Sequence, residues 1–110
     1  MLNWSRIEEL REEVGEEAFA EVVELFLEEV AEAMASVEPG TPRLEAQLHF
    51  LKGAALNLGF DDFAGLCQAG EVAARHGRAE QVDLDAIHDC FETTKTEFMT
   101  RIYAAGYLAA

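Results

Sequence analysis

The chain has 110 residues, half of them apolar, and its 8 basic and 22 acidic side chains give a formal net charge of −14. This length suffices for a single domain, 1–110, whose core needs no disulfide or metal. The charge disfavours nucleic acid and anionic membranes as partners, and no apolar run approaches the roughly 20 residues that span a bilayer. Cys67 and Cys90 could pair, but two cysteines without a signal peptide fit a cytoplasmic protein with free thiols.

The spacing of apolar residues predicts one short helix and then four longer ones, with no strand-like alternation. Ser5 to Glu8 fits a capping box, which predicts a brief helix that ends at Gly15. A second helix is expected from about Glu17 to Val37, with apolar residues at threes and fours and glutamates on the opposite side.

The proline and glycine residues at 39–42 should separate the second helix from the third. Thr41 is predicted to be the N-cap of the third helix and Pro42 its first residue. This helix should end at Gly59 in a left-handed C-cap, after which Phe60 folds back onto the last turn.

Two further helices are expected. Asp61 is predicted to cap one that runs to about His76 and stops at Gly77, and Asp83 is predicted to cap the last. The apolar stripe of the last helix comprises Leu84, Ile87, Phe91, Phe98 and Ile102. Short connections favour antiparallel neighbours, so the predicted fold class is all-α, an antiparallel up-and-down four-helix bundle with a short additional N-terminal helix.

The third predicted helix carries a histidine on the side away from the core. Its buried seam is predicted to consist of Leu44, Leu48, Leu51, Ala55 and Leu58. At 100° per residue, His49 lies roughly 140° from the centre of that seam, so its ring should face solvent. The surrounding surface is mostly small or apolar, and the docking candidates on it are Ala46, Phe50, Leu56 and Asn57.

The residues one turn after the histidine suit phosphoryl chemistry. A neutral imidazole can attack a phosphoryl group at physiological pH without prior activation by a base. Lys52 could neutralise charge on a group attached to His49, and Gly53 would leave space for a second protein. The alternatives are a solvated lysine and a glycine that serves close helix packing at a cost of about 1 kcal/mol in helix propensity.

The pattern of His49, Leu51, Lys52 and Gly53, followed six residues later by Gly59, resembles the hallmark of histidine-containing phosphotransfer (HPt) domains. The resemblance implies a phosphorelay in which the histidine accepts a phosphoryl group at Nε2 from a receiver-domain aspartate and passes it to another receiver. It implies response-regulator receiver domains and a hybrid sensor histidine kinase as partners. The receiver would supply the aspartate and Mg²⁺, so the chain would have no cofactor of its own and would not be an enzyme.

Four further residues are candidates for supporting the histidine. Glu45, one turn before His49, could accept a hydrogen bond from Nδ1, or could simply face solvent. Gln68, Glu71 and Arg75 share a face of the fourth helix. HPt domains often place a glutamine and a basic residue there. The usual glutamine position falls on Glu71, whose charge would repel a phosphoryl group if the side chain points to it.

The sequence allows two other interpretations. A helical adaptor could dock receivers or partner helices around Phe50 without ever being phosphorylated, but such a patch has no reason to surround a histidine with Lys52 and Gly53. A metal site at His88-Asp89-Cys90 with Glu92 is disfavoured because adjacent residues on a helix point in different directions. No second extensive apolar face is evident, so we expect a monomer.

Overall fold

The computed structural model describes residues 2–108, and every named element within them is a helix. These elements are α1 (Trp4–Val14), α2 (Glu16–Ser36), α3 (Leu44–Asn57), α4 (Asp61–Arg75), the short 3-10 helix η1 (Ala79–Gln81) and α5 (Leu84–Ala104). The predicted all-α class is therefore confirmed. None of the helices described is long and apolar enough to cross a membrane.

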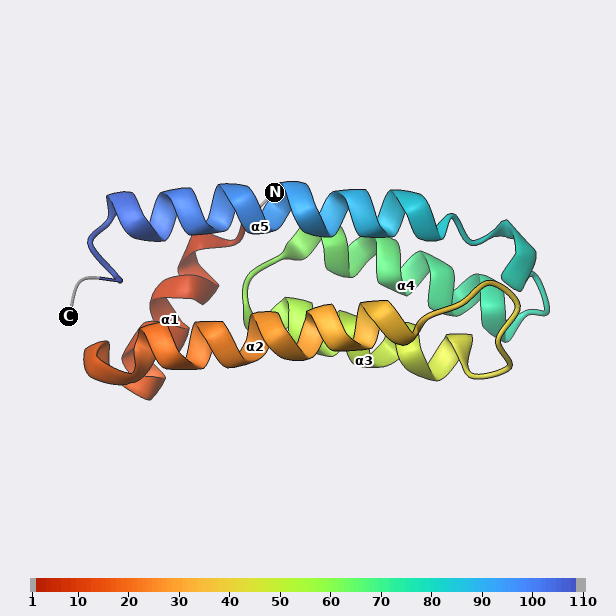
Figure 1. Ribbon diagram of the computed structural model, residues 1–110, viewed down its shortest axis with the longest axis horizontal. Helices are drawn as coiled ribbons and strands as arrows, with labels where there is room; N and C mark the ends of the chain where they lie inside the picture. The colour runs from red at the N-terminus through yellow and green to blue at the C-terminus, as the bar shows by residue number, and fades with distance from the viewer. Residues whose placement is uncertain (1, 109–110) are drawn as a thin grey trace.

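The molecule is elongated, with extents of 46 × 20 × 19 Å. The helices α2 to α5 run along its long axis, and α1 lies obliquely at one end (Figure 1). The closest packing joins α3 to α4, the two helices that carry the candidate site residues.

Side chains from all five α-helices form one buried core. The seam predicted for α3 is confirmed, because Leu44, Leu48, Leu51, Ala55 and Leu58 are all buried. The predicted stripe of α5 is also buried at Ile87, Phe91, Phe98 and Ile102, while Leu84 is partly buried. The rings of Phe60 and Phe98 meet edge to face at 5.2 Å between centroids, a geometry that adds to the stability from apolar burial.

The end of α3 agrees with the prediction from its glycine. Gly59 has a φ of 76°, in the left-handed region that favours glycine. The amide of Phe60 then donates to the carbonyl of Ala55 at 2.9 Å, which turns the chain back onto the last turn of α3. Phe60 is fully buried, so this reversal also contributes an aromatic ring to the core.

The predicted starts of the first and third helices were wrong. The first helix is capped by Asn3 rather than Ser5, because the Asn3 side chain accepts a hydrogen bond from the amide of Arg6 at 3.1 Å. Thr41 and Pro42 lie in a turn before α3, which begins at Leu44. The hydroxyl of Thr41 accepts from the amide of Arg43 at 3.3 Å, so it closes that turn instead of capping the helix.

The predicted caps of the last two helices had different outcomes. Asp61 is the first residue of α4 rather than its cap, because the Phe60 carbonyl already accepts from the amide of Ala64 at 2.9 Å. Asp83 does cap α5, and its carboxylate accepts from the amide of Ala86 at 3.0 Å.

The N-terminal segment is attached directly to the end of α3. The amide of Asn3 donates to the carbonyl of Gly59 at 2.7 Å, and Leu2 forms an isolated antiparallel bridge with Phe60. The guanidinium of Arg6 donates to the carbonyl of Asn57 at 3.3 Å. A Cβ at Gly59 would lie 2.7 Å from the carbonyl oxygen of Asn3, so only glycine allows this close approach.

Candidate functional site

The histidine singled out from the sequence lies on α3 with 68% of its side chain exposed, which confirms the predicted orientation toward solvent. Its Nδ1 atom is 2.8 Å from Oε2 of Glu71 on α4. One edge of the His49 ring is therefore held by the protein, and the other edge is left to solvent.

Glu71 is the buried centre of this site, with only 5% of its side chain exposed. The ammonium of Lys52 donates to its Oε1 at 2.8 Å, and the guanidinium of Arg75 donates to its Oε2 at 3.3 Å. The hydrogen bond from Lys52, together with that from His49, lowers the pKa of the Glu71 carboxyl although burial acts in the opposite direction. The carboxylate is thus ionised at neutral pH.

An ionised carboxylate can only accept hydrogen bonds, and this fixes the state of the neutral His49 ring. The hydrogen must be on Nδ1, where it is donated to Glu71. The lone pair is then on Nε2, at the opposite side of the ring. The side chain of Glu71 accordingly selects the tautomer whose Nε2 can act as a nucleophile.

Glu45 has a different partner from the one considered in the sequence analysis. Its Oε2 accepts from Nε of Arg75 at 2.9 Å, and this hydrogen bond is the main cause of the raised pKa of Arg75. Glu71, not Glu45, is the residue bonded to Nδ1 of His49. The expectation for Glu45 failed because α4 packs close enough to α3 to bring its own carboxylate to the ring.

Glu45, Lys52, Glu71 and Arg75 form a network of ion pairs beside His49, and the charges in this network balance. Glu45 and Glu71 supply two negative charges, and Lys52 and Arg75 supply two positive charges, linked by the ion pairs described. The negative charge of Glu71 was expected to repel a phosphoryl group on His49. This repulsion is offset by the two cations bound to Glu71, Lys52 and Arg75.

One residue that positions this network was missed in the sequence analysis. Gly70, which directly precedes Glu71, is buried and faces Leu48 of α3. The spacing of Phe63, Cys67 and Gly70 on one side of α4 could have indicated that a small residue lies in the helix contact there.

The surface around His49 is open. Gly53 is exposed, and no heavy atom outside its own helical surroundings in residues 2–108 comes within 4 Å of a Cβ built on it. The alternative that this glycine serves close helix packing is therefore wrong. Beside the ring is a hollow of about 410 Å³, lined by Pro42, Glu45, Ala46, His49 and Glu71.

The other predicted surface residues are also accessible. Ala46, Phe50, Leu56 and Asn57 are all exposed, with Phe50 at 49% and Leu56 at 48%. The side-chain oxygen of Asn57 accepts from Arg6 of α1 at 3.5 Å, so Asn57 also connects α3 to α1. Gln68 is exposed on α4 and is not among the residues bonded to Glu71.

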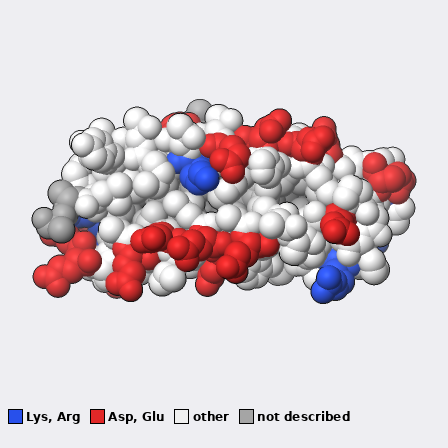
Figure 2. Space-filling view, viewed as in Figure 1, with Lys and Arg blue, Asp and Glu red and all other residues white. Residues whose placement is uncertain are grey.

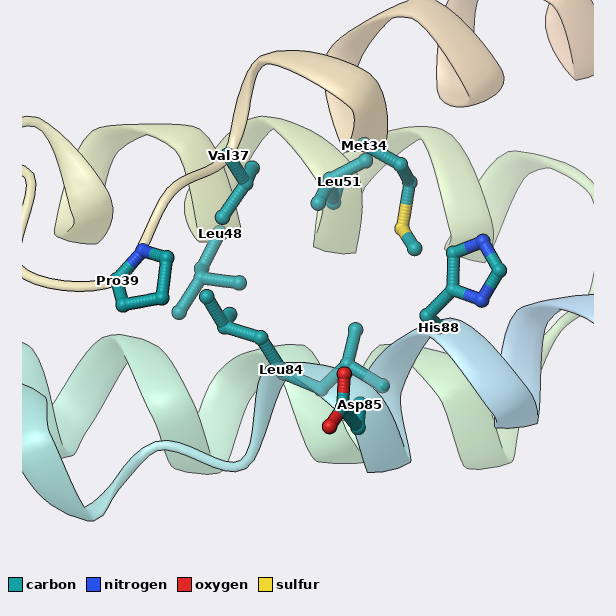
Figure 3. A pocket seen from close by; sticks show the side chains of 9 residues that line it. Met34, Val37, Pro39, Leu48, Leu51, Leu84, Asp85 and His88 are labelled. Carbon is teal, nitrogen blue, oxygen red and sulfur yellow. The ribbon is translucent and has the colours of Figure 1, made fainter.

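A second hollow, of about 240 Å³, lies between α2, α3 and α5 (Figure 3). Its lining comprises Met34, Val37, Pro39, Leu48, Leu51, Leu84, Asp85, Ile87 and His88. The α3 residues that line it belong to the buried seam, so it lies on the other side of this helix from His49. Among residues 2–108, no group of three or more His, Cys, Asp or Glu side chains could hold a metal ion.

Both cysteines are free, as expected. Cys67 is buried in the core, and burial raises the pKa of its thiol to about 12. A thiol with so high a pKa is a poor nucleophile and acts here as a small apolar side chain.

Comparison with known proteins identifies a family for this chain. The profile of the Hpt domain family matches residues 21–97, which include His49 and the four charged side chains around it, Glu45, Lys52, Glu71 and Arg75. Neither the curated proteins nor the solved structures gave a match. Because this match covers most of the chain, the chain belongs to the Hpt domain family, whose members carry phosphoryl groups in two-component signalling.

Proposed function

We propose that His49 accepts a phosphoryl group from the aspartate of a receiver domain and relays it to the aspartate of another receiver. The observation that best supports this is the hydrogen bond between Nδ1 of His49 and the ionised Glu71, because it leaves the lone pair on Nε2. The exposure of the ring supports the proposal further, since a phosphodonor has to reach Nε2 directly.

The proposed transfer balances without a proton from solvent. The lone pair of Nε2 attacks phosphorus, the P–O bond to the receiver aspartate breaks, and the aspartate leaves as a carboxylate. The phosphorylated ring keeps its hydrogen on Nδ1 and is therefore a cation, which the Glu71 carboxylate stabilises. In the second transfer the N–P bond breaks, and the ring returns to its neutral form as the leaving group.

Lys52 has two tasks in this proposal. In the unphosphorylated protein its ammonium compensates the buried charge of Glu71. After transfer, the same ammonium would share its three hydrogens between Glu71 and the phosphoryl oxygens, since Lys52 lies one turn from His49 on the same helix.

The remaining machinery would come from the partner. In the proposal the receiver brings the acceptor aspartate and Mg²⁺, a hybrid sensor histidine kinase starts the relay, and this chain acts as a monomeric cytoplasmic carrier with no cofactor or enzyme activity of its own. The carrier itself is one domain, 1–110, an antiparallel four-helix bundle of α2 to α5 with α1 as an additional helix. The receiver would dock on the surface formed by Ala46, Phe50, Gly53, Leu56 and Asn57.

The test is to incubate the protein with a receiver domain phosphorylated on aspartate and to look for phosphate on the chain that is labile in acid and stable in alkali. We expect labelling of the parent protein and of His88→Gln, which removes another exposed histidine. His49→Gln should not be labelled. Equal labelling of His49→Gln would contradict the proposal, and binding of the receiver without any labelling would favour the adaptor alternative.

A further inference from the structure

A groove of about 570 Å³ runs between α2 and α5. It is lined by Ala20, Val23, Glu24, Leu27, Glu28 and Ala31 of α2, by Lys95 and Met99 of α5, and by Leu108. None of these lining residues belongs to α3 or α4, which carry His49 and Glu71. The groove is therefore distinct from the candidate phosphotransfer site, and the sequence analysis did not anticipate this second apolar surface.

The floor of the groove has the dimensions of a helix-binding surface. Its α2 residues extend from Ala20 to Ala31, three turns or about 16 Å of helix. Both alanines are exposed and small, so the backbone of a bound helix could come close to α2. Leu27 of α2 and Met99 of α5 are partly buried and offer apolar contact, and a methionine side chain can adapt to the shape of its partner.

The rim of the groove is acidic. Glu24 and Glu28 line it directly, and α2 has seven glutamates and no lysine or arginine. Figure 2 shows these acidic side chains as a row along α2, with uncharged surface between that row and α5. The cation that lines the groove, Lys95, is 3.3 Å from Glu92 and so is already compensated.

This charge pattern distinguishes between possible occupants. A second copy of the chain would bring another molecule of formal charge −14 to the acidic row, which opposes self-association. A basic partner would gain from the same field and from burial of the apolar floor. We propose that the groove binds an amphipathic helix of a partner protein, one with an apolar stripe for the floor and lysine or arginine residues for the α2 rim.

The proposal goes beyond phosphotransfer and does not depend on it. A helix bound between α2 and α5 would leave the ring of His49 accessible, so the protein could be held by one partner while it exchanges phosphate with another. The groove would then contribute to the choice of partner without contributing to the chemistry.

The test uses the full chain and a synthetic helical peptide with leucines on one face and lysines on the other, titrated by NMR and fluorescence anisotropy. We expect amide shifts confined to α2, α5 and the segment around Leu108. Affinity should fall about tenfold or more in Glu24→Lys/Glu28→Lys. Ala31→Gln, which fills the groove without adding charge, should also weaken binding.

Two controls distinguish specific binding in the groove from nonspecific electrostatic attraction of a basic peptide to an acidic protein. Glu29→Lys/Glu32→Lys makes the same charge change on α2 at residues that do not line the groove, and it should alter affinity by less than about twofold. A peptide of the same composition with its leucines scrambled around the helix should bind more weakly. The proposal would be overturned if the scrambled peptide bound equally well, or if the control variant lost as much affinity as Glu24→Lys/Glu28→Lys. It would also be overturned by amide shifts centred on α3 and α4, or by self-association of the chain that Ala31→Gln abolishes.

Discussion

Gly70 of α4 lies so close to Leu48 of α3 that a Cβ at position 70 would be 2.8 Å from Cδ1 of that leucine. These two residues directly precede Glu71 and His49, the pair joined by the 2.8 Å hydrogen bond. The packing of the first pair therefore sets the separation of the second. A core contact between two helices thus determines which nitrogen of an exposed ring carries the hydrogen.

Gly70→Val should disturb both packing and site, because the added methyl groups would meet Leu48 and also Val82, 3.2 Å from the position of a Cβ. We expect a loss of about 1–3 kcal/mol in the free energy of unfolding and slower phosphoryl acceptance by His49. Gly65→Val is the matched control on the same helix, since a Cβ there meets nothing within 4 Å. Urea denaturation and the transfer assay measure the two effects, and equal behaviour of both variants would contradict this reading.

Glu71→Ala should release the ring of His49. The hydrogen would no longer be confined to Nδ1, and long-range ¹⁵N–¹H NMR of the imidazole should change from one tautomer to a mixture. Phosphoryl acceptance should fall about tenfold or more. Gln68→Ala, an exposed change on the same helix, should leave both the tautomer and the rate unchanged. Retention of a single Nδ1–H tautomer in Glu71→Ala would show that another group holds the ring.

The contribution of Glu71 to stability should depend on pH in a defined direction. Its pKa is lowered in the folded protein from the ordinary value of 4.5, mainly by the hydrogen bond from Lys52, so the unfolded chain takes up the proton first as the pH falls. The stabilisation is then complete above about pH 4.5 and is lost as the pH falls through the lower pKa of the folded state. We expect Glu71→Gln to cost about 1–2 kcal/mol at pH 7 and progressively less toward pH 3, measured by urea denaturation. A difference that stays constant over this range would rule out the ionised carboxylate as its source.

Lys52→Met should separate charge from packing, because methionine keeps most of the apolar stem. We expect slower phosphoryl transfer by about tenfold and a shorter lifetime of the phosphorylated histidine, since the ammonium no longer offsets the added negative charge. The chain has one other lysine, Lys95, and the control variant Lys95→Met should leave the rate of phosphoryl transfer unchanged. A normal rate in Lys52→Met would mean that the receiver alone supplies the compensating charge.

Gly53 offers a test of docking that does not disturb the fold. Gly53→Ala should raise the free energy of unfolding by about 0.5–1 kcal/mol, because the site is helical and a Cβ meets no neighbour. Gly53→Arg should be at least as stable as the parent but should obstruct the approach of a receiver to His49. Thermal unfolding and the transfer assay with both variants check this, and rapid transfer in Gly53→Arg would place the docking surface elsewhere.

The sequence predicted the helical segments and the exposed histidine because both depend on local periodicity. The seam through Leu48 and Leu51 determined where His49 points, and no knowledge of the other helices was needed. Errors occurred where two signals compete over a few residues, as between Ser5 and Asn3 for the cap of α1. The partner of Nδ1 could not be predicted, because it depends on how closely α4 packs against α3, and a distance between two helices is not contained in the pattern of either one.

The attachment of Asn3 to Gly59 has a practical consequence. The family match begins at residue 21, so a protein shortened to the matched range would lack α1 and the contacts that the N-terminal segment makes with the end of α3. The carbonyl of Gly59 and that of Asn57 would lose their hydrogen bonds from Asn3 and Arg6, and Phe60 would lose its antiparallel bridge with Leu2. Such trimming would weaken the attachment of the C-terminal end of α3, the helix that carries His49. Leu2, Asn3 and Arg6 therefore stabilise this helix although they lie outside the range that the family profile matches.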